Sequence, residues 1–65
     1  MDKQPERFPV SCEFEGRTCK GTWWIAGRIM TVATGLGGKS DRVGPEPAER
    51  QAQALLMELA KAGKA

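Results

Sequence analysis

An eight-residue stretch from Ala33 to Ser40, Ala-Thr-Gly-Leu-Gly-Gly-Lys-Ser, contains residue types that hold phosphate groups in proteins. It matches the phosphate-binding loop of nucleotide hydrolases, with Ala33 in place of the first glycine. That loop needs a helix that begins at its Lys-Ser pair, whereas Gly44-Pro45 follows Lys39 too closely for a helix to form. A glycine-rich turn between two strands explains the same residues, and we expect no nucleotide hydrolysis here.

The two cysteines, Cys12 and Cys19, are the next candidates for chemistry, and six residues separate them. They are either a cross-strand pair that forms a disulfide and acts as a redox switch, or two reduced thiols that pack as small core hydrophobes. Their spacing is not that of a C-x-x-C redox motif, and two cysteines without any histidine leave a four-ligand zinc site incomplete. We therefore expect no metal and no cofactor.

Catalysis has little support elsewhere in the sequence. The chain has no histidine, its carboxylates are scattered, and no serine, threonine or cysteine has an evident base beside it. Its 65 residues are also too few to enclose a substrate pocket of ordinary size. We expect a protein that is not an enzyme and has no catalytic residues.

The strongest candidates for a binding surface surround the tandem tryptophans, Trp23 and Trp24. Neighbours on a strand point to opposite faces of a sheet, so we expect Trp23 in the core and Trp24 on the outer face, with Ile29 as its cross-strand partner. Trp24 is either a solvent-facing side chain that stabilises its hairpin, with Arg7 stacked over the ring, or an anchor for a partner. The candidate interaction surface consists of Trp24, Ile29, Lys20, Thr22, Thr31 and Arg17.

Two short turns determine how the strands that carry these residues pair. Residues 10–14 alternate apolar and polar side chains, and a two-residue turn at Glu15-Gly16 leads into a second strand over residues 18–25. A turn at Ala26-Gly27 then leads into a third strand over residues 28–34. The expected pairs are Cys12 with Cys19, Val10 with Gly21, Trp23 with Met30, and Ile25 with Arg28.

Both turns place the same apolar side chains on one inner face of the sheet, and this agreement indicates a core. A fourth strand over residues 39–43 would follow a Gly37-Gly38 turn and bring Val43 beside Val32. The inner face is expected to contain Val10, Cys12, Phe14, Cys19, Trp23, Ile25, Met30 and Val32.

Residues 46–62 have the pattern of one amphipathic helix. Pro47 suits its first turn, and Gly63 suits the position just after its end. Gln51 and Gln53 are expected on the surface that faces solvent. The apolar stripe would lie across the inner face of the sheet and consists of Ala48, Ala52, Leu55, Leu56, Leu59 and Ala62.

The predicted fold is α+β, a three- or four-stranded antiparallel β-meander with one C-terminal α-helix packed on one face. We expect residues 1–7 to form a disordered tail and residues 8–65 a single small domain. Leu, Ile, Val and Phe number eleven, so the core is small, and burial against a partner would stabilise it further. The sequence has neither a signal peptide nor a run of apolar residues that spans a membrane, so we expect a cytoplasmic protein without a membrane partner.

Several short segments resemble a group of short uncharacterised bacterial proteins. The resemblance implies a compact cytosolic protein with a β-meander and a C-terminal helix, and it assigns no catalytic residue. It rests on Phe14-Glu15-Gly16-Arg17, Gly21-Thr22-Trp23, Met30-Thr31-Val32 and Leu55-Leu56-Met57-Glu58-Leu59.

Two functions remain open on these grounds. The leading hypothesis is a non-catalytic module that forms a homodimer or binds an unknown protein partner through the outer sheet face around Trp24. The alternative is a nucleic-acid-binding domain that uses the same face, although a net charge of +2 gives only weak attraction to phosphates.

Overall fold

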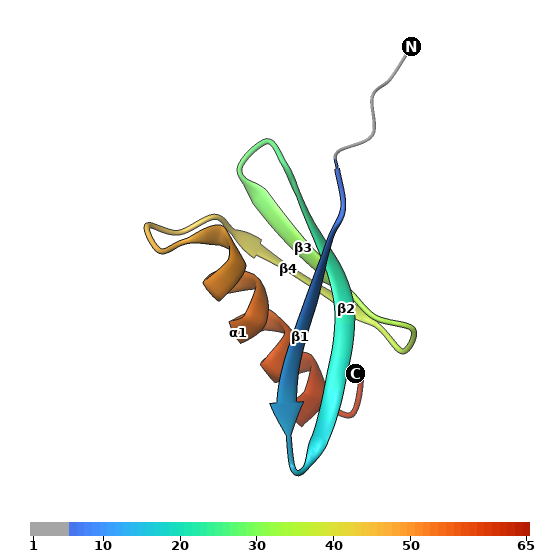
Figure 1. The fold of residues 1–65 in the computed structure, drawn as a ribbon. Helices are drawn as coiled ribbons and strands as arrows, with labels where there is room; N and C mark the ends of the chain where they lie inside the picture. Colours follow the sequence, from blue (N-terminus) through green and yellow to red (C-terminus); the bar gives the residue numbers. More distant parts are fainter. Residues whose placement is uncertain (1–5) are drawn as a thin grey trace.

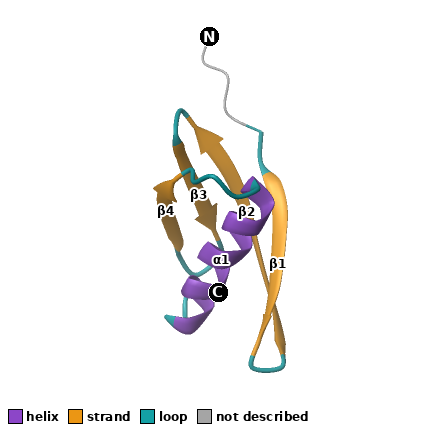
Figure 2. Cartoon of the chain, turned by 90° about the vertical axis from the view of Figure 1, so that its left-hand side faces the viewer, coloured by secondary structure: helices purple, strands orange, loops and turns teal. Residues whose placement is uncertain are grey.

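The computed structural model describes residues 6–65, which form a four-stranded antiparallel sheet with one helix across one face (Figure 1). The strands lie side by side in the order of the sequence, and a view from the helix side shows α1 lying across the sheet (Figure 2). The predicted α+β class is confirmed, with four strands, while residues 1–5 of the predicted tail lie outside the described residues. The elements are β1 (Phe8–Phe14), β2 (Arg17–Ala26), β3 (Ile29–Ala33), β4 (Gly38–Arg42) and α1 (Ala48–Lys61).

The first hairpin has the predicted register, with Cys12 opposite Cys19. Its two turn residues both have positive φ, 52° at Glu15 and 77° at Gly16, as a type I′ turn requires. This turn type matches the twist of the flanking strands. Glycine adopts the left-handed conformation at no cost, whereas Glu15 adopts it against a steric penalty at its Cβ.

The second hairpin differs from its predicted register by two residues, because its turn is Gly27-Arg28 and not Ala26-Gly27. Gly27 has a φ of 64° at the first turn position, where a type II′ turn prefers glycine. Trp23 consequently lies opposite Val32, and Ile25 opposite Met30, in place of the predicted partners. A shift of two residues keeps every side chain on its predicted face.

The fourth strand exists, but it begins and ends one residue earlier than predicted and follows a longer loop. The hydroxyl group of Thr34 accepts hydrogen bonds from the N–H groups of Leu36 and Gly37, both at 3.1 Å, and thereby forms a loop over residues 34–37. Val43 therefore does not lie beside Val32. It follows the end of β4, where its N–H group donates to the carbonyl oxygen of Arg28 at 2.8 Å.

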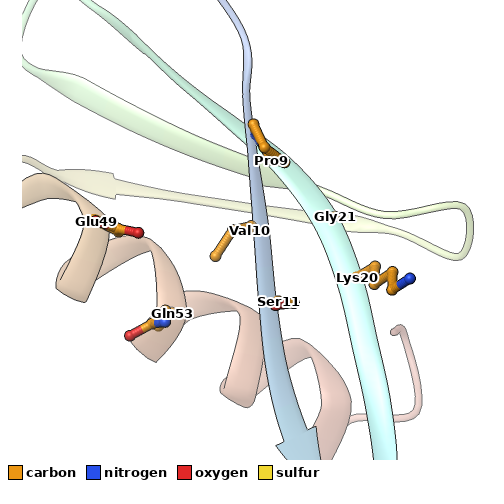
Figure 3. Close-up of a pocket in the computed structure, with 7 residues that line it drawn as sticks. All are labelled: Pro9, Val10, Ser11, Lys20, Gly21, Glu49 and Gln53. Atoms are coloured by element: carbon orange, nitrogen blue, oxygen red, sulfur yellow. The ribbon is translucent and has the colours of Figure 1, made fainter.

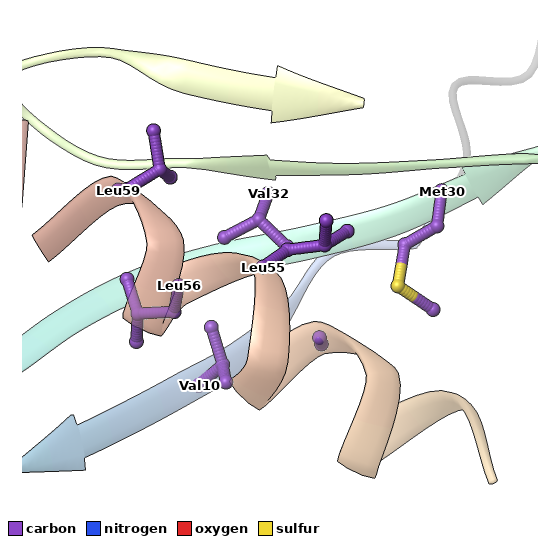
Figure 4. Packing of buried hydrophobic residues seen from close by; sticks show 7 residues of the cluster. Val10, Met30, Val32, Leu55, Leu56 and Leu59 are labelled. Carbon is purple, nitrogen blue, oxygen red and sulfur yellow. The ribbon is translucent and has the colours of Figure 1, made fainter. Parts of the chain in front are cut away.

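The core lies between α1 and the inner face of the sheet (Figure 4). Met30, Val32 and Leu56 are fully buried at its centre. Trp23 packs against this cluster from the inner face, as predicted, and stacks on Phe8 with 4.8 Å between the ring centroids. The buried members of the cluster are Val10, Met30, Val32, Ala52, Leu55, Leu56 and Leu59.

The helix begins one residue after Pro47, which is the N-cap, and ends as predicted at a glycine. Gly63 has a φ of 75°, and its N–H group and that of Lys64 donate to the carbonyl oxygens of Ala60 and Leu59 at 3.0 and 2.8 Å. These two hydrogen bonds form a Schellman motif. Ala62 lies at the C-cap and is exposed, so it does not extend the apolar stripe.

Gln51 is buried, contrary to its predicted position on the solvent-facing side of the helix. Its Nε2 donates to the carbonyl oxygen of Arg42 at 2.7 Å, and its Oε1 accepts from the N–H group of Gly44 at 2.9 Å. Gln51 thus ties the connection between β4 and α1 to the helix. Both polar ends of the side chain have a backbone partner, which makes its burial favourable.

Candidate functional site

The face of the sheet opposite α1 has no covering element among residues 6–65. The strand alternation places five of the six predicted surface residues there together: Lys20, Thr22, Trp24, Ile29 and Thr31. Arg17 lies apart from them, because it pairs with Phe14 and shares the face of Cys19. We call this surface the outer face, and it comprises Arg7, Ser11, Glu13, Lys20, Thr22, Trp24, Ile29, Thr31, Ala33, Ser40 and Arg42.

Trp24 is half-buried on the outer face, and the guanidinium carbon of Arg7 lies 4.6 Å from the centre of its ring. This is the predicted cation–π contact, and it holds the residue before β1 against the outer face. The predicted partner of Trp24 was wrong, since Thr31 lies opposite it and Ile29 lies opposite Ala26. Ile29 is a diagonal neighbour on the same face and leaves 45 % of its surface exposed.

Hydroxyl groups occupy much of the remaining outer face. Thr31 and Ser40 face each other on β3 and β4, and their side-chain oxygens are 2.8 Å apart in a hydrogen bond. Thr22 is exposed beside Trp24 and lies opposite Ala33. The outer face is therefore largely polar, with one aromatic ring on β2.

The charges on the outer face are mainly positive. Arg7, Lys20 and Arg42 lie on it together with one carboxylate, that of Glu13. Within residues 6–65 none of these three cations forms an ion pair. The cations are thus available to an anionic partner, and the excess of positive charge is local although the whole chain carries only +2.

The loop that resembles a phosphate-binding loop does not have that geometry. The N–H groups of Leu36 and Gly37 already donate to the hydroxyl group of Thr34, which itself donates to the carbonyl oxygen of Lys64. Lys39 lies on β4, on the helix side of the sheet, with its Nζ 3.2 Å from a carboxylate oxygen of Glu58. The loop closes a hairpin and docks the C-terminal residues.

A groove of about 430 Å³ crosses the outer face between β2 and the start of the β3–β4 loop. Its floor includes small residues, and two of its walls are the side chains of Arg7 and Lys20. No carboxylate lies among the residues that line it. These residues are Arg7, Lys20, Gly21, Thr22, Ala33, Thr34 and Gly35.

A second cleft, of about 490 Å³, lies where the edge of β1 meets α1 (Figure 3). Glu49 and Gln53 border it from the helix, whereas the side chain of Lys20 points to the other side of the sheet (Figure 3). Its polar groups therefore do not converge on one point, as a specific small-molecule site requires. Gln53 is neutral and Glu49 is negative, so the lining of this cleft has no excess of positive charge.

The two thiols lie opposite each other on the inner face, and both are free. Cys19 is buried, and Cys12 packs at the margin of the core. Burial raises the pKa of the Cys12 thiol above its ordinary value of 9.0, and the neighbouring Cys19 adds to that effect. A raised pKa lowers the fraction of reactive thiolate, which favours the prediction of structural thiols.

Both free edges of the sheet are protected against pairing with another strand. Pro9 removes one backbone donor from β1. At the end of β4 the N–H group of Arg42 donates to Asp41 at 2.8 Å, while its carbonyl oxygen accepts from Gln51. A partner is therefore better accommodated on the outer face than along an edge.

Comparison with protein families, with curated proteins and with solved structures gave no match to this chain. The resemblance to short bacterial proteins thus stays a prediction. In the part of the chain that the structure describes, no three acidic, cysteine or histidine side chains gather as metal ligands. The helix over residues 48–61 is too short and too polar to cross a membrane, and no other helix occurs in that part.

Proposed function

We propose that this protein is a non-catalytic module that binds single-stranded nucleic acid on its outer face. The observation that carries the proposal is that Arg7, Lys20 and Arg42 share one face with the half-buried ring of Trp24, with Arg7 stacked on the ring, and that no helix covers this face among residues 6–65. Cations attract the phosphates of a strand, while an aromatic ring or the guanidinium plane stacked on it accepts an unpaired base. The hydroxyl groups of Thr22 and Ser40 add hydrogen-bonding capacity to the same face.

The dimensions of the sheet favour a single strand over a duplex. Four strands spaced about 4.8 Å apart give a face about 14 Å wide between the outer strands. The major groove of B-form DNA is about 12 Å wide and admits a helix or a two-stranded ribbon. A four-stranded face is too wide to enter it, whereas a flexible single strand can lie across such a face.

Self-association through the outer face, which is one form of the leading hypothesis from the sequence, has less support. In a two-fold symmetric dimer this face would meet its own copy, and its excess of positive charge would be repelled. Among the described residues of this face, Ile29 is the one exposed large aliphatic side chain, and Trp24 is half-buried already. A dimer interface here would therefore bury little additional apolar area. Hydrophobic burial and charge therefore both favour an anionic partner over a second copy.

The proposal is tested by fluorescence anisotropy with labelled single-stranded oligonucleotides of DNA and RNA. If three cations each neutralise one phosphate, the logarithm of the affinity falls with the logarithm of the salt concentration with a slope of about −2. A rise from 20 to 100 mM salt should then weaken binding by about 30-fold. Arg42→Glu should weaken binding further at low salt, since it places a carboxylate on the face.

Arg50→Glu is the matched control, because Arg50 is exposed on α1 and its replacement changes the net charge equally. Equal losses in the two variants would mean that overall charge, and not the outer face, governs binding. Failure of every oligonucleotide to bind at 20 mM salt would overturn the proposal. A dimer in sedimentation that Ile29→Glu dissociates would instead assign the outer face to self-association.

A further inference from the structure

We infer that the groove beside Lys20 is the phosphate subsite of the outer face, where a phosphodiester group of the bound strand is held. This inference rests on the proposed function, because it assigns one position on the same surface to one chemical group. The groove lies on the outer face and has a volume of about 430 Å³. A phosphate group with its ribose would fill part of that volume and leave the adjoining base near Trp24.

The chemistry of the lining selects an anion. Arg7 reaches the groove from the residue before β1 and Lys20 from β2, and none of the seven lining residues is acidic. An arginine presents two parallel N–H donors to a phosphate, and a lysine adds a compact positive charge. The cleft between β1 and α1 provides a contrast, since Glu49 lines it and would repel the same group.

The shape of the groove depends on small residues and on a fixed loop. Gly21 and Ala33 are small residues that line the groove, and Gly35 has no atom within 4 Å of the position of a Cβ, so its end of the groove is open. The hydroxyl group of Thr34 is engaged by the backbone of its own loop and by Lys64. Thr34 therefore fixes the loop that borders the groove. The groups left to bind the anion are the side chains of Arg7 and Lys20.

The sharpest test places a carboxylate at the rim of the groove. Gly35→Glu introduces a negative charge at a position with open space, so the fold should tolerate it. Leu36→Glu introduces the same charge one residue further along, on a side chain that is 70 % exposed and does not line the groove. Gly35→Glu should weaken oligonucleotide binding about fivefold, and Leu36→Glu by less than twofold.

A second measurement uses inorganic phosphate alone as the probe, with amide chemical shifts recorded during the titration. The amides of Thr22 and Gly35 should shift, with saturation above about 1 mM, while that of Arg42 should not. Unchanged oligonucleotide binding in Gly35→Glu, together with weaker binding in Arg42→Glu, would overturn the subsite and leave the proposed function standing. Phosphate shifts at Thr22 without any oligonucleotide binding would support the subsite and overturn the proposed function. Equal shifts at Thr22 and Arg42 would mean diffuse ion binding and would overturn the subsite.

Discussion

Replacement of Gln51 by methionine should destabilise the protein more than any other polar-to-apolar change on α1. Gln51 keeps only 6 % of its surface exposed, and both ends of its amide bond the backbone of the connection between β4 and α1. Methionine has a similar length and a good helix propensity, so Gln51→Met removes the hydrogen bonds with little change in volume. The partners left behind are the carbonyl oxygen of Arg42 and the N–H group of Gly44.

The expected loss is about 2 kcal/mol, because each of the two hydrogen bonds contributes about 1 kcal/mol net to the free energy of unfolding. The bonds measure 2.7 and 2.9 Å, which is ordinary geometry for strong amide contacts. In a domain of this size 1 kcal/mol corresponds to roughly 4–8 °C in the melting temperature. Gln51→Met should therefore melt about 8–16 °C lower than the unchanged protein.

Urea unfolding followed by tryptophan fluorescence measures this difference directly. The matched control is Gln53→Met, which makes the same replacement two residues further along the same helix on an exposed side chain. It should stay within about 0.5 kcal/mol of the unchanged protein. Equal stabilities of the two methionine variants would show that the buried amide does not tie α1 to β4, and the reasoning would be refuted.

Three further predictions concern the first hairpin and its neighbour strands. Gly21→Ala should lower stability by about 1–3 kcal/mol in urea unfolding, because a Cβ there would lie 2.6 Å from the carbonyl oxygen of Ala33. Glu15→Asn should raise stability by about 1 kcal/mol in the same assay, since asparagine tolerates the positive φ of a type I′ turn. The raised pKa of Cys12 means that the unfolded chain loses this proton first, so stability should fall as the pH rises above 9.0, and Cys12→Ala should remove that part of the decline in pH-dependent unfolding.

Much of the fold could be predicted from alternation and turn chemistry. The register of the first hairpin was predictable because a two-residue turn at Glu15-Gly16 keeps both flanking strands in alternation, although both strands extend beyond their predicted ends. The helix end was equally predictable, since Gly63 supplies the left-handed conformation that a Schellman motif needs. Local signals of this kind act within a few residues and do not depend on the rest of the chain.

The failures arose where a side chain decides the local structure through contacts that spacing does not reveal. Gln51 lies three residues after Ala48 and four before Leu55, so its spacing is that of the apolar stripe although its side chain is polar. Its burial depends on two backbone groups of the connection that precedes the helix. The hydroxyl group of Thr34 shapes the β3–β4 loop and so sets where β4 begins. The helical spacing thus contained a signal for Gln51 that its polar side chain outweighed, whereas the hydrogen bonds of Thr34 to backbone groups leave no repeat in the sequence.

The predicted composition of the outer face was unaffected by the wrong register of the second hairpin, and the reason is geometric. A turn displaced by one residue changes each cross-strand pair by two, so Trp24 kept its face while its partner changed from Ile29 to Thr31. The identity of this cross-strand partner matters, because the hydroxyl group of Thr31 now lies directly across from Trp24 and the exposed Ile29 lies diagonally from it. Trp24 and Ile29, the apolar pair expected at a dimer interface, are thereby diagonal neighbours and not direct partners, while the positive side chains Lys20 and Arg42 lie on the same face. The register of the strands, more than the composition of the chain, therefore supports our proposal of a polyanionic partner over a second copy of the chain.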